Sequence, residues 1–344
     1  MDAAHRGTAE PGNHADPGVE TNGTAGVDTL VALVATRDIE CLRRYIVQTP
    51  LLPLGASKPG PCTPVDSAVE NTTSTLRGAV WHLLCRPSKR ARTASYVAVV
   101  DTLAQRSLSM VACLEKIAVD VPRTWPGVTH FTARVSRSAL LRVLAAVALV
   151  NDARYVQGLN VIAGAFLYVL PEPLAYDALV SFTRSYAPTY FLCNDLRGVH
   201  RGCALAAHIL RLVDAELAQA LEAAANIPLE QAMLVHAFPA IMSMSLSVPP
   251  LDDAITLFDL VIAFGAHLSV LLVVARLVAG RGPLLQRQHS MQQVLNPRRP
   301  EDAICIPATQ IGRECIRIAA LLPEPLRDAL CTHTLIDKAV VLDA

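Results

Sequence analysis

The chain has 344 residues, of which 52% are apolar and 17% charged, so it can bury a large core and is not disordered as a whole. Its thirty basic and thirty acidic residues give a formal charge of zero, which excludes the broad positive field of a non-specific nucleic-acid binder. Nine scattered cysteines, none of them in a C-x-x-C pair, favour a reducing compartment. We therefore expect protein partners and no nucleic acid.

The N-terminal part is predicted to hold one short helical segment between two flexible stretches. Residues 1–27 are small, polar and rich in Gly and Pro, and they lack the continuous apolar core of a secretory signal, which predicts a disordered tail. Residues 28–51 carry apolar side chains at near-helical spacing, with residues 36–38 as a candidate break. Residues 52–75 are again rich in Pro, Gly, Ser and Thr, which predicts flexibility. We expect the helical segment to pack on the main domain.

From residue 76 onward, apolar residues recur with three-four spacing, as in Leu140, Leu144 and Val147, while the alternation typical of strands is scarce. Prolines, glycines and asparagines interrupt this pattern at intervals of ordinary helix length. No fixed repeat of about 20 to 50 residues is present, so a helical solenoid is not indicated. The sequence predicts an all-α, irregular multi-helix domain over residues 76–335, followed by a tail at 336–344.

Two stretches of the second half need separate interpretation. Residues 260–278 are nearly continuous in Leu, Val, Ile and Ala and are a transmembrane candidate. Gly265, His267 and Arg276 interrupt them, so a buried pair of helices is favoured over a membrane-embedded protein. Residues 280–300 are polar and rich in Arg and Gln, which predicts an exposed loop.

The sequence lacks the short motifs of self-contained catalysis. It contains no G-x-x-x-x-G-K-[ST] phosphate loop, no G-x-G-x-x-G dinucleotide turn, no G-x-S-x-G nucleophile elbow and no H-E-x-x-H zinc helix. Its ten histidines do not combine with cysteines or carboxylates in a metal-binding spacing, so no metal is implied. The basic run at 86–92 would suit a nuclear-import signal or an anionic docking patch, although a solvated loop is the favoured interpretation.

Arg123 stands out because it lies in a loop bounded by Pro122 and Pro126, whose fixed backbone angles limit how the loop moves. The loop should therefore hold the Arg123 guanidinium in a restricted range of positions. Asp120, three residues earlier, would hold the guanidinium through a charge-assisted bond before a partner arrives. An arginine of this kind, taken alone, is more often merely solvated.

A second polar segment, Tyr-Val-Gln-Gly-Leu-Asn, lies at residues 155–160 beside a helix break. Gly158 removes a side chain next to Gln157 and would let the backbone of another protein come close. Asn160 follows Gln157 by three residues, near the same helical face. Taken alone, Gln157 is more often a helix-terminal polar residue than a catalyst, so the argument depends on the two segments occurring together.

Together the two segments resemble the TBC family of GTPase-activating proteins, whose helical domain carries I-x-x-D-x-x-R-T followed by Y-x-Q-G-x-N. The residues that match the two motifs are Ile117, Asp120, Arg123, Thr124, Tyr155, Gln157, Gly158 and Asn160. The resemblance also includes Arg77-Gly78 and spans residues 76–335. It departs from the family pattern in apolar exchanges, with Trp125 at a usual phenylalanine, Leu159 at a usual methionine and Phe258 at a usual tryptophan.

This resemblance implies a GTPase activator that acts in trans on a small Ras- or Rab-like GTPase and has no independent active site for the nucleotide. Arg123 and Gln157 would be its catalytic fingers, and an arginine finger is worth about 10³ to 10⁵ in rate. Supporting or interface roles would fall to Asp120, Thr124, Tyr155, Gly158 and Asn160. GTP and magnesium would be bound by the partner GTPase, so the chain would need no cofactor of its own.

Within the family, the segments at 238–241 and 250–265 look most like the mitotic-exit checkpoint branch found at spindle poles. That likeness implies a restraint on mitotic exit, a separate scaffold subunit, and a cytoplasmic location at the spindle pole body or microtubule organising centre. Two alternatives keep the same fold: a Rab activator in membrane traffic, and a non-catalytic module that binds a GTPase or a scaffold.

Overall fold

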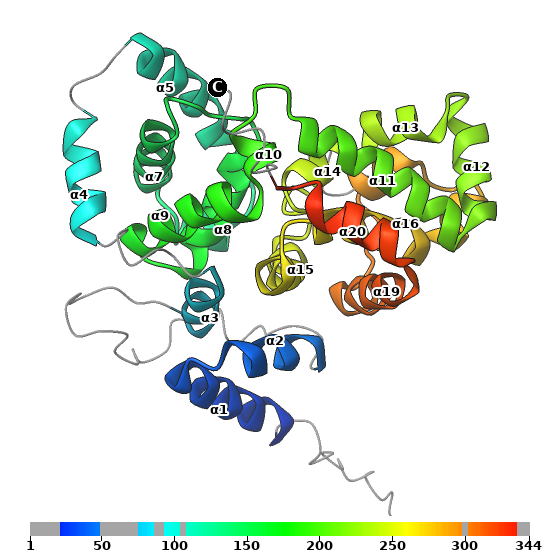
Figure 1. Ribbon diagram of the computed structural model, residues 1–344, viewed down its shortest axis with the longest axis horizontal. Coiled ribbons are helices and arrows are strands. Elements are labelled where there is room, and N and C mark those ends of the chain that lie inside the picture. Colours follow the sequence, from blue (N-terminus) through cyan, green and yellow to red (C-terminus); the bar gives the residue numbers. More distant parts are fainter. Residues whose placement is uncertain (1–20, 49–74, 86–92, 104–107, 298–301, 336–344) are drawn as a thin grey trace, which may run out of the picture.

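The computed structural model describes residues 21–48, 75–85, 93–103, 108–297 and 302–335. Every regular element in these ranges is a helix or a helical turn (Figure 1), so the all-α prediction is confirmed. The basic run at 86–92 and the expected C-terminal tail at 336–344 lie outside the described residues. So do residues 1–20 of the expected N-terminal tail and almost all of the expected flexible segment at 52–75.

The helices that follow residue 75 gather in two bodies, with one long helix between them (Figure 1). The first body consists of α3 (Leu76–Cys85), α4 (Thr93–Thr102), α5 (Leu108–Asp120), the 3₁₀ turn η2 (Val121–Arg123), α6 (Thr129–Thr132), α7 (Arg137–Val150), α8 (Leu159–Val169), α9 (Glu172–Ser181), the π-helical turn η3 (Phe182–Tyr186) and α10 (Pro188–Phe191). The second consists of α11 (Arg197–Val213), α12 (Ala215–Ala225), α13 (Leu229–His236), α14 (Phe238–Met242), α16 (Leu268–Ala279), α17 (Arg281–Leu285), α18 (Met291–Leu295), α19 (Ala308–Leu321) and α20 (Glu324–Thr332). Helix α15 (Leu251–Phe264) joins the bodies, because it packs on α3 as well as on α16 and α19.

Helix α7 is the centre of the first body. The Ser136 hydroxyl caps its first turn by accepting a hydrogen bond of 3.1 Å from the backbone N–H of Ala139. Residues 143–148 are all buried, since α5, α8 and α9 cover the helix. At the other end the Arg184 guanidinium donates to the carbonyl of Val150, which satisfies one of the open acceptors at the helix terminus.

Helix α16 is the corresponding centre of the second body. It is apolar on every side and is buried from Leu268 to Leu277, as expected of a core helix. Helix α15 precedes it and ends at Phe264, where Gly265 turns the chain with a φ of +125°. The predicted buried helix pair at 260–278 is therefore confirmed. Within the described ranges, no helix combines the length and the apolar character that a membrane crossing requires.

The prediction of an exposed loop at 280–300 is wrong. Its described part forms α17 and α18, and α18 buries Met291, Val294 and Leu295 against α16. A capping box starts α18, because the Ser290 hydroxyl accepts from the backbone N–H of Gln293 while the Gln293 side chain accepts from the Ser290 N–H. The polar composition hid this element because only one face of so short a helix is apolar.

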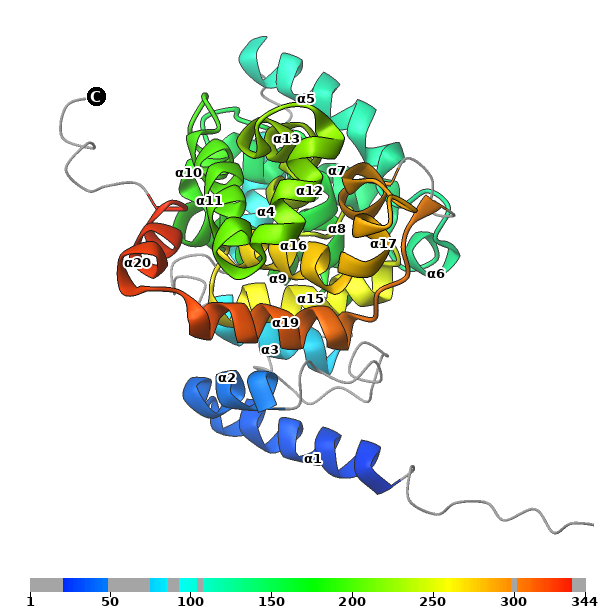
Figure 2. The same ribbon diagram turned by 90° about the vertical axis from the view of Figure 1, so that its right-hand side faces the viewer.

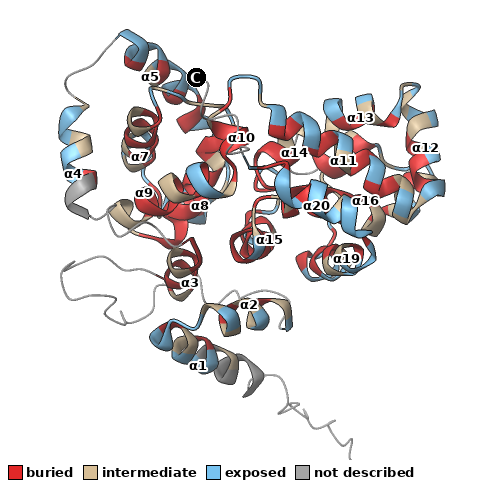
Figure 3. Cartoon of the chain, viewed as in Figure 1, coloured by how far each residue is buried: buried red, intermediate tan, exposed pale blue. Residues whose placement is uncertain are grey.

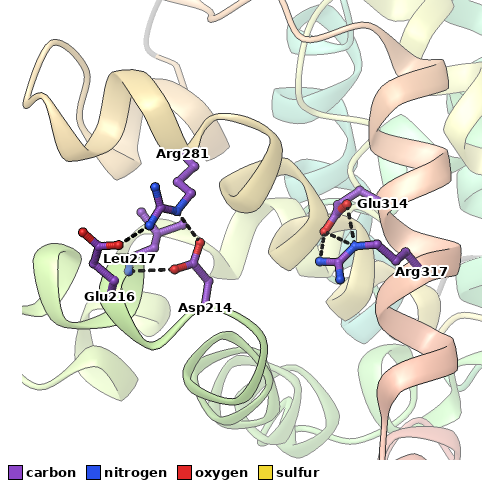
Figure 4. A network of polar contacts seen from close by, with 6 residues as sticks. All are labelled: Asp214, Glu216, Leu217, Arg281, Glu314 and Arg317. Atoms are coloured by element: carbon purple, nitrogen blue, oxygen red, sulfur yellow. Dashed lines mark hydrogen bonds and ion pairs between the residues drawn. The ribbon is translucent and has the colours of Figure 1, made fainter.

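Charged side chains fasten α17 to α12 at the surface of the second body (Figure 4). The Arg281 guanidinium donates at 2.8 Å to Asp214, whose other oxygen accepts the backbone N–H of Leu217 at 3.0 Å and so caps α12. Arg281 also contacts Glu216.

The distribution of buried residues agrees with the division into two bodies. Figure 3 shows buried residues concentrated in the interior of each body and exposed ones on the outer faces of α12, α13 and α20.

An ion pair in the core fastens α3 to α15. The Arg77 guanidinium donates to both carboxylate oxygens of Asp259 at 3.1 Å, and both side chains are almost fully enclosed. The indole N–H of Trp81 donates to the same carboxylate at 2.7 Å, while the Trp81 ring packs edge-on against Phe258. Gly78 lets the other side of α3 approach the end of α8, because a Cβ there would lie 2.1 Å from the carbonyl oxygen of Val169.

Two N-terminal helices, α1 (Thr21–Thr36) and α2 (Ile39–Gln48), pack against α3 and α15. Helix α1 begins upstream of the boundary that we expect at residue 28, and Arg37, with a φ of +54°, divides it from α2 at the candidate break. The Arg43 guanidinium donates at 2.7 Å to the carbonyl of Ala263 near the C-terminal end of α15. Figure 2 shows this pair lying beside the two bodies, on the α3 side.

Candidate functional site

Arg123 is presented by a short 3₁₀ turn directly after α5. The turn contains Pro122 and is closed by Thr124, whose hydroxyl donates to the Asp120 carbonyl at 3.1 Å. The Arg123 side chain is 68% exposed, and its Nη1 lies 3.7 Å from the Asp120 Oδ1. The two side chains thus lie in ion-pair contact, but the charge-assisted hydrogen bond of about 2.7 to 2.9 Å that the sequence predicts between them is not formed.

Gln157 lies in the loop that joins α7 to α8, and its side chain is exposed. Asp152 and Ala153 both have a φ of +57°, and Gly158, with a φ of +103°, begins α8. A positive φ at a non-glycine residue costs of order 1 to 3 kcal/mol and persists only where the surrounding structure fixes the backbone. Arg154 contributes to that constraint, since its guanidinium donates to the carbonyl of Leu192. The loop that carries Gln157 therefore has a defined shape.

The two loops are joined through buried hydrogen bonds among the motif residues. The Tyr155 hydroxyl donates to the Asp120 Oδ2 at 2.8 Å. The Asn160 amide donates to the Thr124 hydroxyl at 2.8 Å and accepts the backbone N–H of Gly158 at 3.1 Å. Burial, and then the bond to Asp120, raise the pKa of Tyr155 far above its usual range, so its hydroxyl remains a donor. All five supporting residues thus take part in the hydrogen bonds that link the turn carrying Arg123 to the loop carrying Gln157.

Gly158 is required by the fold of the chain itself. Its positive φ favours glycine, and a Cβ added there would lie 3.1 Å from the Cγ of Met242. Met242 is the last residue of α14 and begins the buried segment 242–246, which sequence reasoning did not single out because it has no distinctive motif. The close approach at Gly158 therefore occurs within this chain.

The site offers a cation, the Arg123 guanidinium, and an amide, the Gln157 side chain. In the described ranges, no group of three His, Cys, Asp or Glu side chains is placed to hold a metal ion. A cavity of about 150 Å³ lies beside the Arg123 turn, lined by residues that include Pro122, Phe131 and Leu140. Ligand sites usually measure about 300 to 1,000 Å³, so this cavity is too small for a nucleotide.

A family model of the Rab-GTPase-TBC domain matches residues 74–279, a range that contains both loops and ends with α16. The chain belongs to the TBC family. It is accordingly a GTPase-activating protein whose partner is a small GTPase, as the double motif implies.

Relatives of similar length have names from the control of cell division. The putative mitotic check point protein BUB2 of Dictyostelium discoideum is 31% identical over 265 residues, which is 77% of this chain and 67% of that protein. Cell division control protein 16 of Schizosaccharomyces pombe is 31% identical over 274 residues, or 79% of this chain and 85% of that protein. The mitotic check point protein BUB2 of Saccharomyces cerevisiae is 30% identical over 268 residues, which is 74% of this chain and 82% of that protein.

Solved structures of TBC domains have the same fold. The Ypt/Rab-GAP domain of Gyp1p aligns with a TM-score of 0.64 at 14% identity, over 86% of this chain and 97% of that one. The TBC domain of Skywalker/TBC1D24 from Drosophila melanogaster aligns with a TM-score of 0.56 at 11% identity, over 87% and 98%. At these identities the likeness concerns the fold alone.

Proposed function

We propose that Arg123 and Gln157 enter the nucleotide site of a small GTPase and accelerate its hydrolysis of GTP. Hydrolysis is slow because charge accumulates on the phosphate oxygens and the attacking water is poorly held. A guanidinium placed against the phosphates stabilises that charge, and an amide placed against the water orients it. The observation that carries the proposal is the exposure of these two side chains on loops that buried hydrogen bonds join.

The contact between Arg123 and Asp120 suits a side chain that must act on another molecule. One contact of 3.7 Å restricts the direction of the guanidinium but leaves most of its five N–H donors open to a phosphate. The Gln157 amide likewise has no hydrogen bond to any described residue. Both groups are therefore available without breaking a strong internal interaction.

GTP and magnesium belong to the partner in this proposal. The chain supplies one positive charge and one amide, while the GTPase supplies the phosphate loop and the metal ligands that this sequence lacks. Arginine fingers are worth about 10³ to 10⁵ in rate, equivalent to roughly 4 to 7 kcal/mol of the barrier.

The names of the three relatives favour a role in cell division. We infer that the activity restrains mitotic exit, with a scaffold subunit that places the chain at the spindle pole, in the cytoplasm. A Rab activator of membrane traffic is the second candidate, because the family model and the Gyp1p structure are named for Rab GTPases. A non-catalytic module is less favoured, since both finger side chains are present and unobstructed.

The test is phosphate release by a panel of GTP-loaded mitotic-exit GTPases and Rabs, each with the wild-type chain, Arg123→Ala or Gln157→Ala. Each reaction is run with and without the proteins that co-purify with the chain. Acceleration of one GTPase, lost in both variants, supports the two-finger mechanism and identifies the substrate. Binding of a GTPase without acceleration in any reaction would instead support the non-catalytic module.

A further inference from the structure

A buried segment of the second body contacts both the turn that carries Arg123 and the loop that carries Gln157. This segment, residues 242–246, consists of the last residue of α14 and the four residues after it, and it is almost completely enclosed. Met244 and Ser245 have φ values of +55° and +64°. The Ser243 hydroxyl donates to the Pro239 carbonyl at 2.7 Å, and its oxygen lies 2.7 Å from the Ser247 hydroxyl oxygen. Such a backbone is held in one shape by its surroundings. The backbone of this segment is therefore a fixed support for the side chains that contact it.

Trp125 connects the Arg123 turn to this segment. Its indole N–H donates to the carbonyl of Leu246 at 3.3 Å. Its ring meets Phe131 edge-on, with centroids 4.8 Å apart and planes at 81°. Gly164 of α8 leaves room for the ring, because a Cβ there would lie 3.0 Å from it. One side chain thus joins α8, the turn and the segment after α14.

The backbone at Trp125 explains why such an anchor is needed. Trp125 has a φ of +42°, two residues after Arg123, and a tryptophan does not adopt this region without a compensating contact. The ring contacts and the bond to Leu246 supply that contact. The same segment also contacts the loop that carries Gln157, because the side chain of Met242 packs against the neighbouring Gly158.

We propose that Trp125 is a positioning residue, whose indole N–H bond to the Leu246 carbonyl fixes the Arg123 turn on the segment that also supports Gln157. The proposal rests on the catalytic role proposed above for Arg123. Trp125 does not touch the reacting atoms; it sets where the guanidinium stands. Phenylalanine at this position would keep the ring and lose the donor.

The test compares Trp125→Phe with Trp81→Phe in steady-state activation of the GTPase. The second variant is a matched control, because it also removes an indole N–H bond, to Asp259, but in the core. Small displacements of a catalytic group cost up to about 10² in rate. We expect Trp125→Phe to lower kcat about tenfold with KM and Tm little changed, and Trp81→Phe to lower Tm with kcat of the folded protein unchanged.

Other results overturn the proposal. An unchanged kcat in Trp125→Phe, or a raised KM with kcat retained, would show that the bond does not set the position of Arg123. Should Trp125→Phe fail to fold, hydrogen exchange of the two indole N–H groups of the wild-type chain decides: a Trp125 N–H that exchanges as fast as a free indole contradicts the bond. Failure of the catalytic proposal is distinguishable, because Arg123→Ala would then retain the full acceleration.

Discussion

Two arginine–aspartate pairs of this chain show how burial separates a structural contact from a reactive one. Arg77 and Asp259 lie in the core, with side chains 1% and 0% exposed and two parallel hydrogen bonds of 3.1 Å. Arg123 and Asp120 lie at the end of α5, where the aspartate is 9% exposed, the arginine 68% exposed, and the single contact is 3.7 Å long. The aspartates are similarly enclosed, so the arginines make the difference.

The closed pair is enclosed in the core, out of reach of another molecule, and it holds α3 against α15. The open pair keeps its aspartate occupied by Tyr155 and leaves the guanidinium directed outward. A buried pair is costly to break because the remaining charge loses its compensation, whereas an exposed contact is worth little stability. Stability should therefore respond to the first pair and activity to the second.

The largest expected effect is the loss of activity in Arg123→Ala. Removing the guanidinium should reduce the acceleration of GTP hydrolysis about 10³-fold or more, because the charge on the phosphates is then unopposed. The free energy of unfolding should change by less than about 1 kcal/mol. Single-turnover phosphate release and denaturant titration measure the two quantities. The matched control is Arg137→Ala, an exposed arginine near the same turn, and an equal loss in that variant would contradict the assignment.

The core pair should behave in the opposite way in Asp259→Asn. The amide cannot balance the buried Arg77 charge, so the free energy of unfolding should fall by about 3 to 5 kcal/mol. Denaturant titration measures this loss, and the activity of the remaining folded protein should be unchanged. Asp195→Asn is the control, since its pair with Arg197 is exposed and should be worth less than about 1 kcal/mol. Equal losses would refute the distinction between the pairs.

Much of the fold, and the positions of the two candidate finger residues, could be predicted from the sequence. The three-four spacing indicated an all-α domain, and the polar interruption around Gly265 indicated a buried helix pair rather than a membrane span; both are confirmed. The two motifs placed Arg123 and Gln157 beside helix breaks, and the structure has both in loops. Periodicity and helix-breaking residues are local signals, so a single sequence carries them.

The remaining features depend on contacts between distant residues. The bond from Tyr155 to Asp120 joins residues 35 positions apart, and the one from Trp125 to Leu246 joins residues 121 apart. The second of these ends on a backbone carbonyl, which no residue type reveals. Helix α18 was missed for another reason: its capping box is visible in the sequence, but its polar composition argued for a loop.

A third buried aspartate sharpens the comparison, because Asp177 of α9 forms no ion pair with an arginine in the part of the chain that the structure describes. Its Oδ1 has no hydrogen-bond partner among the described residues, and burial raises its pKa to about 7. Between about pH 4 and pH 7 the folded chain then holds a proton that the unfolded chain has released, so stability falls as the pH rises, by at most about 1.4 kcal/mol per unit.

Asp177→Asn should remove this dependence. The variant should gain stability relative to the wild type as the pH rises from 4 to about 7, and the difference should be constant above about pH 8, where Asp177 is ionised in both states. Denaturant titrations across this range measure it. Asp101→Asn, at an exposed position of α4, provides the control for the loss of one surface charge. A difference that does not vary with pH would show that Asp177 is not a buried acid of this kind.

The smallest expected effect is that of Asp120→Asn, which separates the two functions of this aspartate. The asparagine Oδ1 still accepts the Tyr155 hydroxyl, so the loops should remain joined and the free energy of unfolding should change by less than about 1 kcal/mol. Only the charge facing Arg123 is lost, and the guanidinium becomes less restricted. We expect the activated hydrolysis rate to fall about tenfold, equivalent to roughly 1.4 kcal/mol, with KM retained.

Tyr155→Phe is the complementary variant, because it removes the hydrogen bond between the two loops and leaves the Asp120 charge in place. If both variants lowered the rate equally and neither altered stability, the aspartate would act on Arg123 through the loop link as much as through its charge.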